Sequence, residues 1–145
     1  MQLSTKGRYA VMAMTDLAHR SDGRPAPLAD IAARQELSLS YLEQLFARLR
    51  RRGLVTSVRG PGGGYRLARA PDQITVADVV IAVDEPLRAT RCAGHNSTGC
   101  MRGGARCLTH DLWEETGRQI IDYLSRVSLA DVLSGRLRET KREAA

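Results

Sequence analysis

The chain has 145 residues, enough for one domain with an appendage but hardly for two enzyme-sized domains, and no apolar run approaches the roughly 18 residues of a membrane span. Its formal net charge of +6 lies entirely in residues 1–75, which hold 12 basic and 6 acidic side chains, a distribution typical of surfaces that bind nucleic acid or anionic lipid. The lack of a secretory signal pattern predicts a cytoplasmic protein, and no set of acid, base and nucleophile indicates an enzyme with a small-molecule substrate.

Three amphipathic helices are predicted before residue 54. The first covers residues 3–19 with Ser4 as its N-cap, and a Gly- and Pro-containing loop separates it from a short helix over residues 28–35. The third begins after Ser38 or Ser40 and ends at Gly53. It is the clearest, because its apolar residues recur at i, i+3, i+4 and i+7: Leu42, Leu45, Phe46 and Leu49. The last two helices, joined by a tight turn, form a candidate helix-turn-helix.

After Gly53 the apolar pattern changes to the period of a strand. LVTSV alternates, RGPGGG is a turn, and YRLA alternates again, which predicts a β-hairpin. A hairpin directly after a recognition helix is a wing. A further helix is expected from Thr75, ended by Pro86. The predicted fold class is therefore mainly α: a winged helix-turn-helix domain with a small β-hairpin wing and a long C-terminal dimerisation helix.

The outer face of the third helix carries the candidate DNA contacts. The first residues of a recognition helix reach base edges, while basic residues further along hold phosphates. The candidate base-contacting residues are Ser40, Tyr41, Glu43 and Gln44, with Ser38 as a further candidate DNA contact, and the candidate phosphate anchors are Arg48, Arg50, Arg51 and Arg52. Glu43 would repel phosphate, which indicates discrimination against wrong sequences. Alternatively, the S-x-x-E spacing lets Glu43 bond back to the amide of Ser40 in a capping box.

The tip of the predicted wing is a second candidate DNA contact, made of Arg59, Gly60, Pro61 and Gly62. The glycines after Pro61 permit close backbone approach to a phosphate, while Arg59 can enter the minor groove. A tight hairpin with an incidental arginine is the alternative interpretation.

All three cysteines fall in the next segment. Cys92, Cys100 and Cys107 are separated by seven and six residues, and His110 follows Cys107 after two. Three thiolates and an imidazole suit zinc or an iron-sulfur cluster, although zinc fingers usually space their cysteines more closely. His95 is another possible fourth ligand, and three unligated thiols are the remaining alternative. A single imidazole among thiolates would leave the bound group labile, as a sensor requires.

A long final helix is predicted from Thr109, its cap. Trp113, Gly117, Ile120, Leu124 and Val127 recur at steps of four and three, which predicts an apolar seam against a partner helix or against the chain's own core. A short helix follows in SLADVLSG, and the charged tail is expected to be disordered. The expected divisions are residues 1–85 for the DNA-binding domain, 86–108 for the cysteine-rich loop, 109–135 for the last helices and 136–145 for the tail.

Five segments together resemble the iron-sulfur cluster regulators, a family of dimeric winged-helix bacterial transcription factors: STKGRYAVMAMTDLA, SLSYLEQLF, GLVTSVRGPGGGYRLA, AVDEP and RCAGHNSTGCMRGGARCLTHDLW. The resemblance covers roughly residues 1–133.

What the resemblance implies is a homodimer that binds double-stranded DNA operators of cluster-assembly or iron-homeostasis genes. It implies one [2Fe-2S] cluster per subunit on Cys92, Cys100, Cys107 and His110. The base-reading role falls on Ser40, Tyr41, Glu43 and Gln44, and the minor-groove role on Arg59. Because the gaps between the cysteines are longer than in the best-matching relatives, a [4Fe-4S] cluster or zinc stays an alternative. From another class of function, an iron-sulfur scaffold or electron-transfer protein is the alternative.

Overall fold

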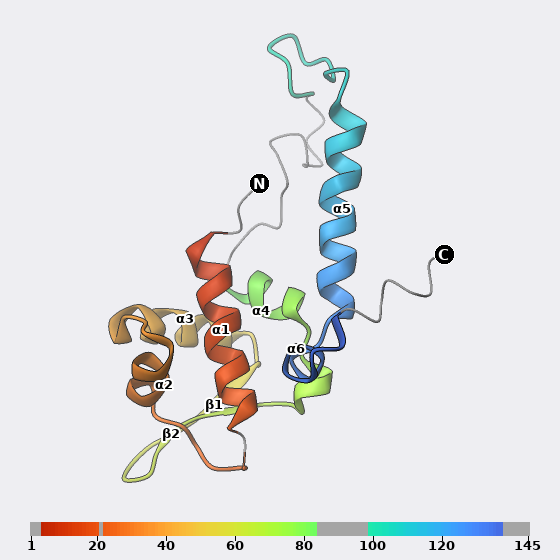
Figure 1. The fold of residues 1–145 in the computed structure, drawn as a ribbon. Helices are drawn as coiled ribbons and strands as arrows, with labels where there is room; N and C mark the ends of the chain where they lie inside the picture. The colour runs from red at the N-terminus through yellow and green to blue at the C-terminus, as the bar shows by residue number, and fades with distance from the viewer. Residues whose placement is uncertain (1–3, 21, 84–98, 138–145) are drawn as a thin grey trace.

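The computed structural model describes residues 4–20, 22–83 and 99–137 (Figure 1). In chain order its elements are α1 (Thr5–His19), α2 (Leu28–Gln35), α3 (Leu39–Arg51), β1 (Val55–Val58), β2 (Gly64–Leu67), the 3-10 turn η1 (Pro71–Gln73), α4 (Val76–Ala82), α5 (His110–Arg126) and α6 (Leu129–Ser134). The strands pair antiparallel as a two-stranded hairpin, with Val55 opposite Leu67. The predicted mainly helical winged helix-turn-helix fold is confirmed.

The main core lies where α1, α2, α3 and α4 meet. The largest buried side chains include Met14, Ile31, Leu42 and Phe46, and the four apolar residues that predicted α3 are all buried. Phe46 also packs edge-on against Tyr65 of β2, with the ring centroids 5.1 Å apart. Burying this apolar stripe fixes which face of α3 points outward, because helical side chains three and four apart share one face.

A charged pair joins α1 to α2 beside this core. The carboxylate of Asp16 is buried and accepts hydrogen bonds from the guanidinium of Arg34, at 2.7 Å from Nη2, and from Nε2 of Gln35, also at 2.7 Å. Burial by itself would raise the pKa of Asp16, but the hydrogen bonds from Arg34 and Gln35 outweigh it and lower the pKa. The pair therefore holds the two helices together in its ionised form.

Several helix ends differ in detail from the sequence prediction. α4 ends at Ala82, ahead of Pro86, because the backbone of Val83 has already left the helical conformation (φ −92°, ψ 19°). Ser4 and Thr109 occupy the N-cap positions of α1 and α5, but neither side chain makes a capping hydrogen bond. Part of the tail predicted to be disordered, residues 138–145, lies outside the described residues.

The starts of α4 and α6 are bound to each other. Thr75 and Ser128 each close a capping box, with Asp78 and Asp131 respectively. The two caps form an antiparallel bridge, in which the amide of Val76 donates to the carbonyl of Val127 at 2.8 Å. The amide of Leu129 donates to the carbonyl of Ile74 at 2.9 Å. This cap-to-cap bridge fastens the C-terminal end of α5 to the winged-helix head, residues 4–83.

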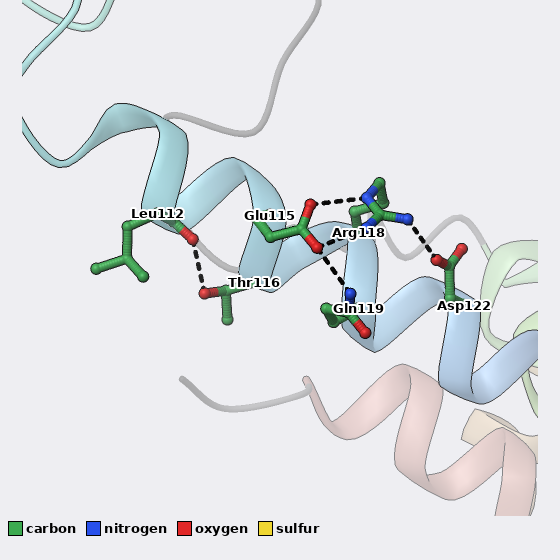
Figure 2. A network of polar contacts seen from close by, with 6 residues as sticks. All are labelled: Leu112, Glu115, Thr116, Arg118, Gln119 and Asp122. Carbon is green, nitrogen blue, oxygen red and sulfur yellow. Dashed lines mark hydrogen bonds and ion pairs between the residues drawn. The ribbon is translucent and has the colours of Figure 1, made fainter. Parts of the chain in front are cut away.

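Beyond that bridge, α5 extends away from the head, with its N-terminal end farthest from it (Figure 1). A polar network covers one side of α5: Arg118 bonds to Glu115 and Asp122, and Gln119 bonds to Glu115 (Figure 2). The hydrogen bonds from Arg118 and Gln119 lower the pKa of Glu115 to about 2. At about 100° per residue this network lies opposite Trp113, Gly117 and Leu124. In the part of the chain that the structure describes, no helix has both the length and the hydrophobicity needed to span a membrane.

Candidate DNA-binding surface and metal centre

The start of α3 presents polar side chains to solvent. Ser38, Ser40, Glu43 and Gln44 are exposed, whereas Tyr41 is half-buried, with its ring edge-on to Tyr9 at a centroid distance of 6.1 Å. The hydroxyl of Ser38 accepts a hydrogen bond from the amide of Tyr41 and lies 3.1 Å from the hydroxyl of Ser40. Three of the four predicted base-contacting residues, together with Ser38, are thus on the outer surface at one end of α3.

The position of the cap decides between the two interpretations of Glu43. Because Ser38 is the N-cap, Tyr41 occupies the third helical position, where the acidic residue of a capping box would stand. Glu43 lies two residues further along, with its side chain exposed. The capping-box alternative, with Ser40 as the cap, is therefore wrong, and Glu43 is available for an intermolecular contact.

The arginines of α3 do not all face the same way. Arg50, Arg51 and Arg52 are exposed, and Arg50 also donates to the hydroxyl of Ser57 on β1 at 3.3 Å. Arg48 is half-buried, and its Nη1 donates to the main-chain carbonyl of Val83 at 3.0 Å. Its expected role as a phosphate anchor therefore competes with a contact inside the protein.

The wing carries its predicted contact residues at an exposed tip, and its base is fixed to the head. Arg59, Gly60, Pro61 and Gly62 are all exposed, and Gly60 and Gly62 have the positive φ expected of the glycine turn. The amide and carbonyl of Tyr65 both bond to Ala26 at 2.9 Å. Next to this pairing, a Cβ on Gly64 would collide with the backbone of Ala26. Gly64 of the glycine run thus allows close backbone approach within the protein, a role that the sequence did not indicate.

Of the predicted metal ligands that the structure describes, Cys100 and His110 meet at the N-terminal end of α5, whereas the thiol of Cys107 lies 3.7 Å from the hydroxyl of Thr109. The Sγ of Cys100 is 3.7 Å from Nδ1 of His110 and accepts a hydrogen bond from the amide of Cys107 at 3.1 Å. His110 is buried, whereas Cys100 is exposed and Cys107 is half-buried. Cys92 and the alternative ligand His95 lie outside the described residues.

A tight turn brings the ligands together. The amide of Gly99 donates to the carbonyl of Gly104 at 3.0 Å, and the amide of Met101 donates to the carbonyl of Ala105 at 3.1 Å. A Cβ at position 99 would collide with the carbonyl groups of Gly104 and Ala105, so only glycine fits this turn. The amide of His110 then bonds to the carbonyl of Cys107, which starts α5 with the imidazole next to the thiol of Cys100.

The spacing of these donors fits a bound metal. In a tetrahedral zinc site, bond lengths of about 2.3 Å to sulfur and about 2.0 Å to nitrogen place the two ligand atoms roughly 3.5 Å apart. The observed 3.7 Å between Cys100 Sγ and His110 Nδ1 is close to that separation. Thiolate and imidazole are also the ligands of iron-sulfur centres with mixed coordination. The donor set therefore suits either group.

Sequence reasoning missed the acidic side chains next to His110. Glu114 Oε2 lies 4.0 Å from His110 Nε2, and the ligand atoms of His110, Asp111 and Glu114 all lie within 4.8 Å of one another. The i, i+4 spacing of His110 and Glu114 on a helix was the available signal.

The predicted dimerisation seam of α5 divides into two parts. At its C-terminal end, Val127 is buried in a small cluster with Val76 and Val80 of α4, and Leu124 packs against it. At its N-terminal end Trp113 is 36% exposed, and Ile120 is half-buried. One end of the seam thus packs on the chain's own core, and the other end is open.

Comparison with known proteins fits this architecture. A family model described as "Rrf2: Iron-dependent Transcriptional regulator" matches residues 3–135. The chain belongs to the Rrf2 family. Among curated Rrf2 relatives, the HTH-type transcriptional regulator IscR of Erwinia tasmaniensis is 56% identical over 92% of this chain and 79% of its own length. That of Aliivibrio salmonicida is 55% identical over 92% of this chain and 77% of its own.

Solved structures give the same result for the fold. The structure titled T. potens IscR is 40% identical to this chain and has a TM-score of 0.75. The match covers 94% of this chain and 88% of the chain in that structure. CymR, titled the global cysteine regulator of B. subtilis, is 33% identical with a TM-score of 0.76, over 92% of this chain and 97% of its own. The Rrf2 relatives are named as transcriptional regulators, a class of DNA-binding protein and not of enzyme.

Proposed function

We propose that this Rrf2 protein is a cytoplasmic, dimeric transcription regulator whose operator binding depends on an iron-sulfur cluster held by Cys92, Cys100, Cys107 and His110. The observation that carries the proposal is the meeting of Cys100 Sγ and His110 Nδ1, 3.7 Å apart, with the amide of Cys107 bonded to the same sulfur, at the start of the helix that is fastened to a winged DNA-binding head. When bound, a [2Fe-2S] cluster supplies a group whose presence reports iron and oxidant status.

The residues around the site account for a cluster that is held but can be lost. His110 would be the single neutral ligand among three anionic thiolates, and a neutral imidazole is displaced from a metal more readily than a thiolate. Cys100 is exposed, so oxidants reach at least one ligand directly. Both features favour a sensor over a permanently bound structural metal site.

The DNA contacts follow from the exposed residues of α3 and the wing. Glu43 and Gln44 can pair with cytosine and adenine edges in the major groove, and Arg59 can enter the minor groove, while Arg50 and Arg51 hold phosphates. A dimer must present its two recognition helices about one helical turn, ~34 Å, apart to match two half-sites. Regulators of the Rrf2 and IscR type bind DNA as dimers, and in this chain the open end of α5 is the candidate contact.

A count of metal and sulfide tests the proposal. The protein, purified anaerobically, should contain two irons and two acid-labile sulfides per subunit, with visible absorption that His110→Ala weakens and Cys100→Ala abolishes. The protein should also bind operator DNA with an affinity that falls as the salt concentration rises, because neutralising DNA phosphates releases counterions. Zinc without sulfide would overturn cluster sensing, and a protein without salt-dependent DNA binding would overturn the regulator.

A zinc-containing repressor of the same fold is the second candidate. The grouping of His110, Asp111 and Glu114 is the observation behind it, because zinc accepts carboxylate and imidazole ligands as well as thiolate. The metal count separates the two candidates. Four irons with four sulfides would indicate the [4Fe-4S] alternative.

A further inference from the structure

Arg48 differs from the other arginines of the recognition helix in what it contacts. Its guanidinium donates to the carbonyl of Val83, the C-cap residue that directly follows α4, at a distance of 3.0 Å. The last carbonyls of a helix lack partners within the helix, and an arginine from a neighbouring element is a suitable donor for them. Arg48, which belongs to α3, therefore caps the C-terminal end of α4.

The other end of α4 is attached to the long helix. The cap-to-cap bridge bonds Val76 to Val127 and Leu129 to Ile74, and the side chains of Val80 and Val127 share one apolar cluster, with Leu124 packed against it. At 1.5 Å per residue, the seven residues of α4 span only about 10 Å. A short helix fixed by hydrogen bonds at both ends moves as a unit.

We propose that Arg48 is a positioning residue: it couples the recognition helix α3 to α4, and through α4 to α5 and its metal centre, and it is not a phosphate anchor. This inference rests on the proposed cluster-dependent regulation. A change in the angle of α5 is passed to α4 through the bridge, and then to α3 through the Arg48–Val83 hydrogen bond and the core that α3 and α4 share.

The test compares Arg48→Met and Arg48→Lys with Arg51→Met in the full-length dimer. Arg51 is the matched control because it is an exposed arginine on the same helix. Operator affinity is measured for cluster-loaded and cluster-free protein over a range of salt concentrations. Amide hydrogen exchange at Ala82 and Val83 is measured on the cluster-free form. Thermal unfolding reports whether each variant folds.

Arg51→Met should weaken binding in both forms, reduce the salt slope by about 1.8, which is about 0.9 for each subunit of the dimer, and leave the loaded-to-empty affinity ratio unchanged. Arg48→Met should keep the salt slope, bring that ratio to within about twofold of one, and speed exchange at Ala82 and Val83. Arg48→Lys should behave like Arg48→Met, because lysine keeps the charge but not the reach and fork of the guanidinium. Since it is the milder change, it replaces Arg48→Met if that variant does not fold.

Three results would overturn the role of Arg48. They are a salt slope that falls in Arg48→Met as in Arg51→Met, an Arg48→Lys variant that keeps the wild-type affinity ratio, and unchanged exchange at Ala82 and Val83. A wild-type protein whose affinity is the same with and without cluster would instead overturn the proposed function. In that case the salt slope and the exchange rates still decide whether Arg48 holds phosphate or joins α3 to α4.

Discussion

Asp16 is a buried charge whose role in the head can be tested by pH. Hydrogen bonds from Arg34 and Gln35 lower its pKa in the folded protein in spite of burial. A lowered folded-state pKa adds stability above the unfolded value, near 3.8, and that stability is lost as pH falls through the folded pKa. The contribution is therefore complete at neutral pH.

Asp16→Asn should lower the free energy of unfolding by about 2 kcal/mol at pH 7, because a charged acceptor of several hydrogen bonds becomes neutral. As pH falls below 3.8 and through the lowered folded-state pKa, the difference from wild type should shrink, because Asp16 becomes protonated. Urea unfolding of wild type and Asp16→Asn at several pH values measures the difference at pH 7 and its decrease at low pH. A difference that stays constant as pH falls well below 3.8 would contradict the ionised pair.

Glu43 has no role as a helix cap, so its charge is available to discriminate among operators. Glu43→Ala and Glu43→Gln should both relax sequence preference, reducing the penalty for a mismatched base by about 1–3 kcal/mol. Binding to a panel of operator variants measures this change. Equal profiles for Glu43→Ala and wild type would show that Glu43 does not select sequence.

At the level of elements, the turn before α5 tests how the metal ligands are assembled. A Cβ at Gly99 collides with the backbone of Ala105, whereas one at Gly103 meets no atom within 4 Å. Gly99→Ala should therefore lower the affinity for cluster or zinc on the order of tenfold. Gly103→Ala is the matched control and should bind as wild type does. Metal content after exposure to a chelator measures the difference, and equal losses from both variants would show that the turn does not hold the ligands.

The spacing of apolar residues in the sequence predicted the helices and strands well. Both α3 and the hairpin follow from residues only a few positions apart. This spacing could not locate contacts between distant residues. The bond from Arg48 to Val83 spans 35 positions and depends on how α4 packs. Ser38 and Ser40 are equivalent caps by type, and only the packed geometry chooses Ser38. For the same reason, the seam on α5 could not be divided between the chain's own core and an open surface.

At the level of the whole molecule, the open end of α5 is the predicted dimer contact. Trp113→Arg should convert the dimer to monomer and weaken operator binding on the order of 100-fold, because two half-sites are no longer bound by one linked molecule. Leu133→Arg changes an equally exposed apolar residue on α6 and is the control, with no expected effect on assembly. Sedimentation measures the oligomeric state. A dimer that survives Trp113→Arg would place the contact elsewhere.

The bridge between the starts of α4 and α6 also governs how the molecule unfolds. Because the amides of Val76 and Leu129 each donate across it, the long helix cannot separate from the head without breaking main-chain bonds within the core. We expect head and long helix to melt in a single cooperative transition, with these two amides among the slowest to exchange. We therefore expect no stable state in which α5 has detached while the head stays folded. A change that releases α5 should unfold the head as well.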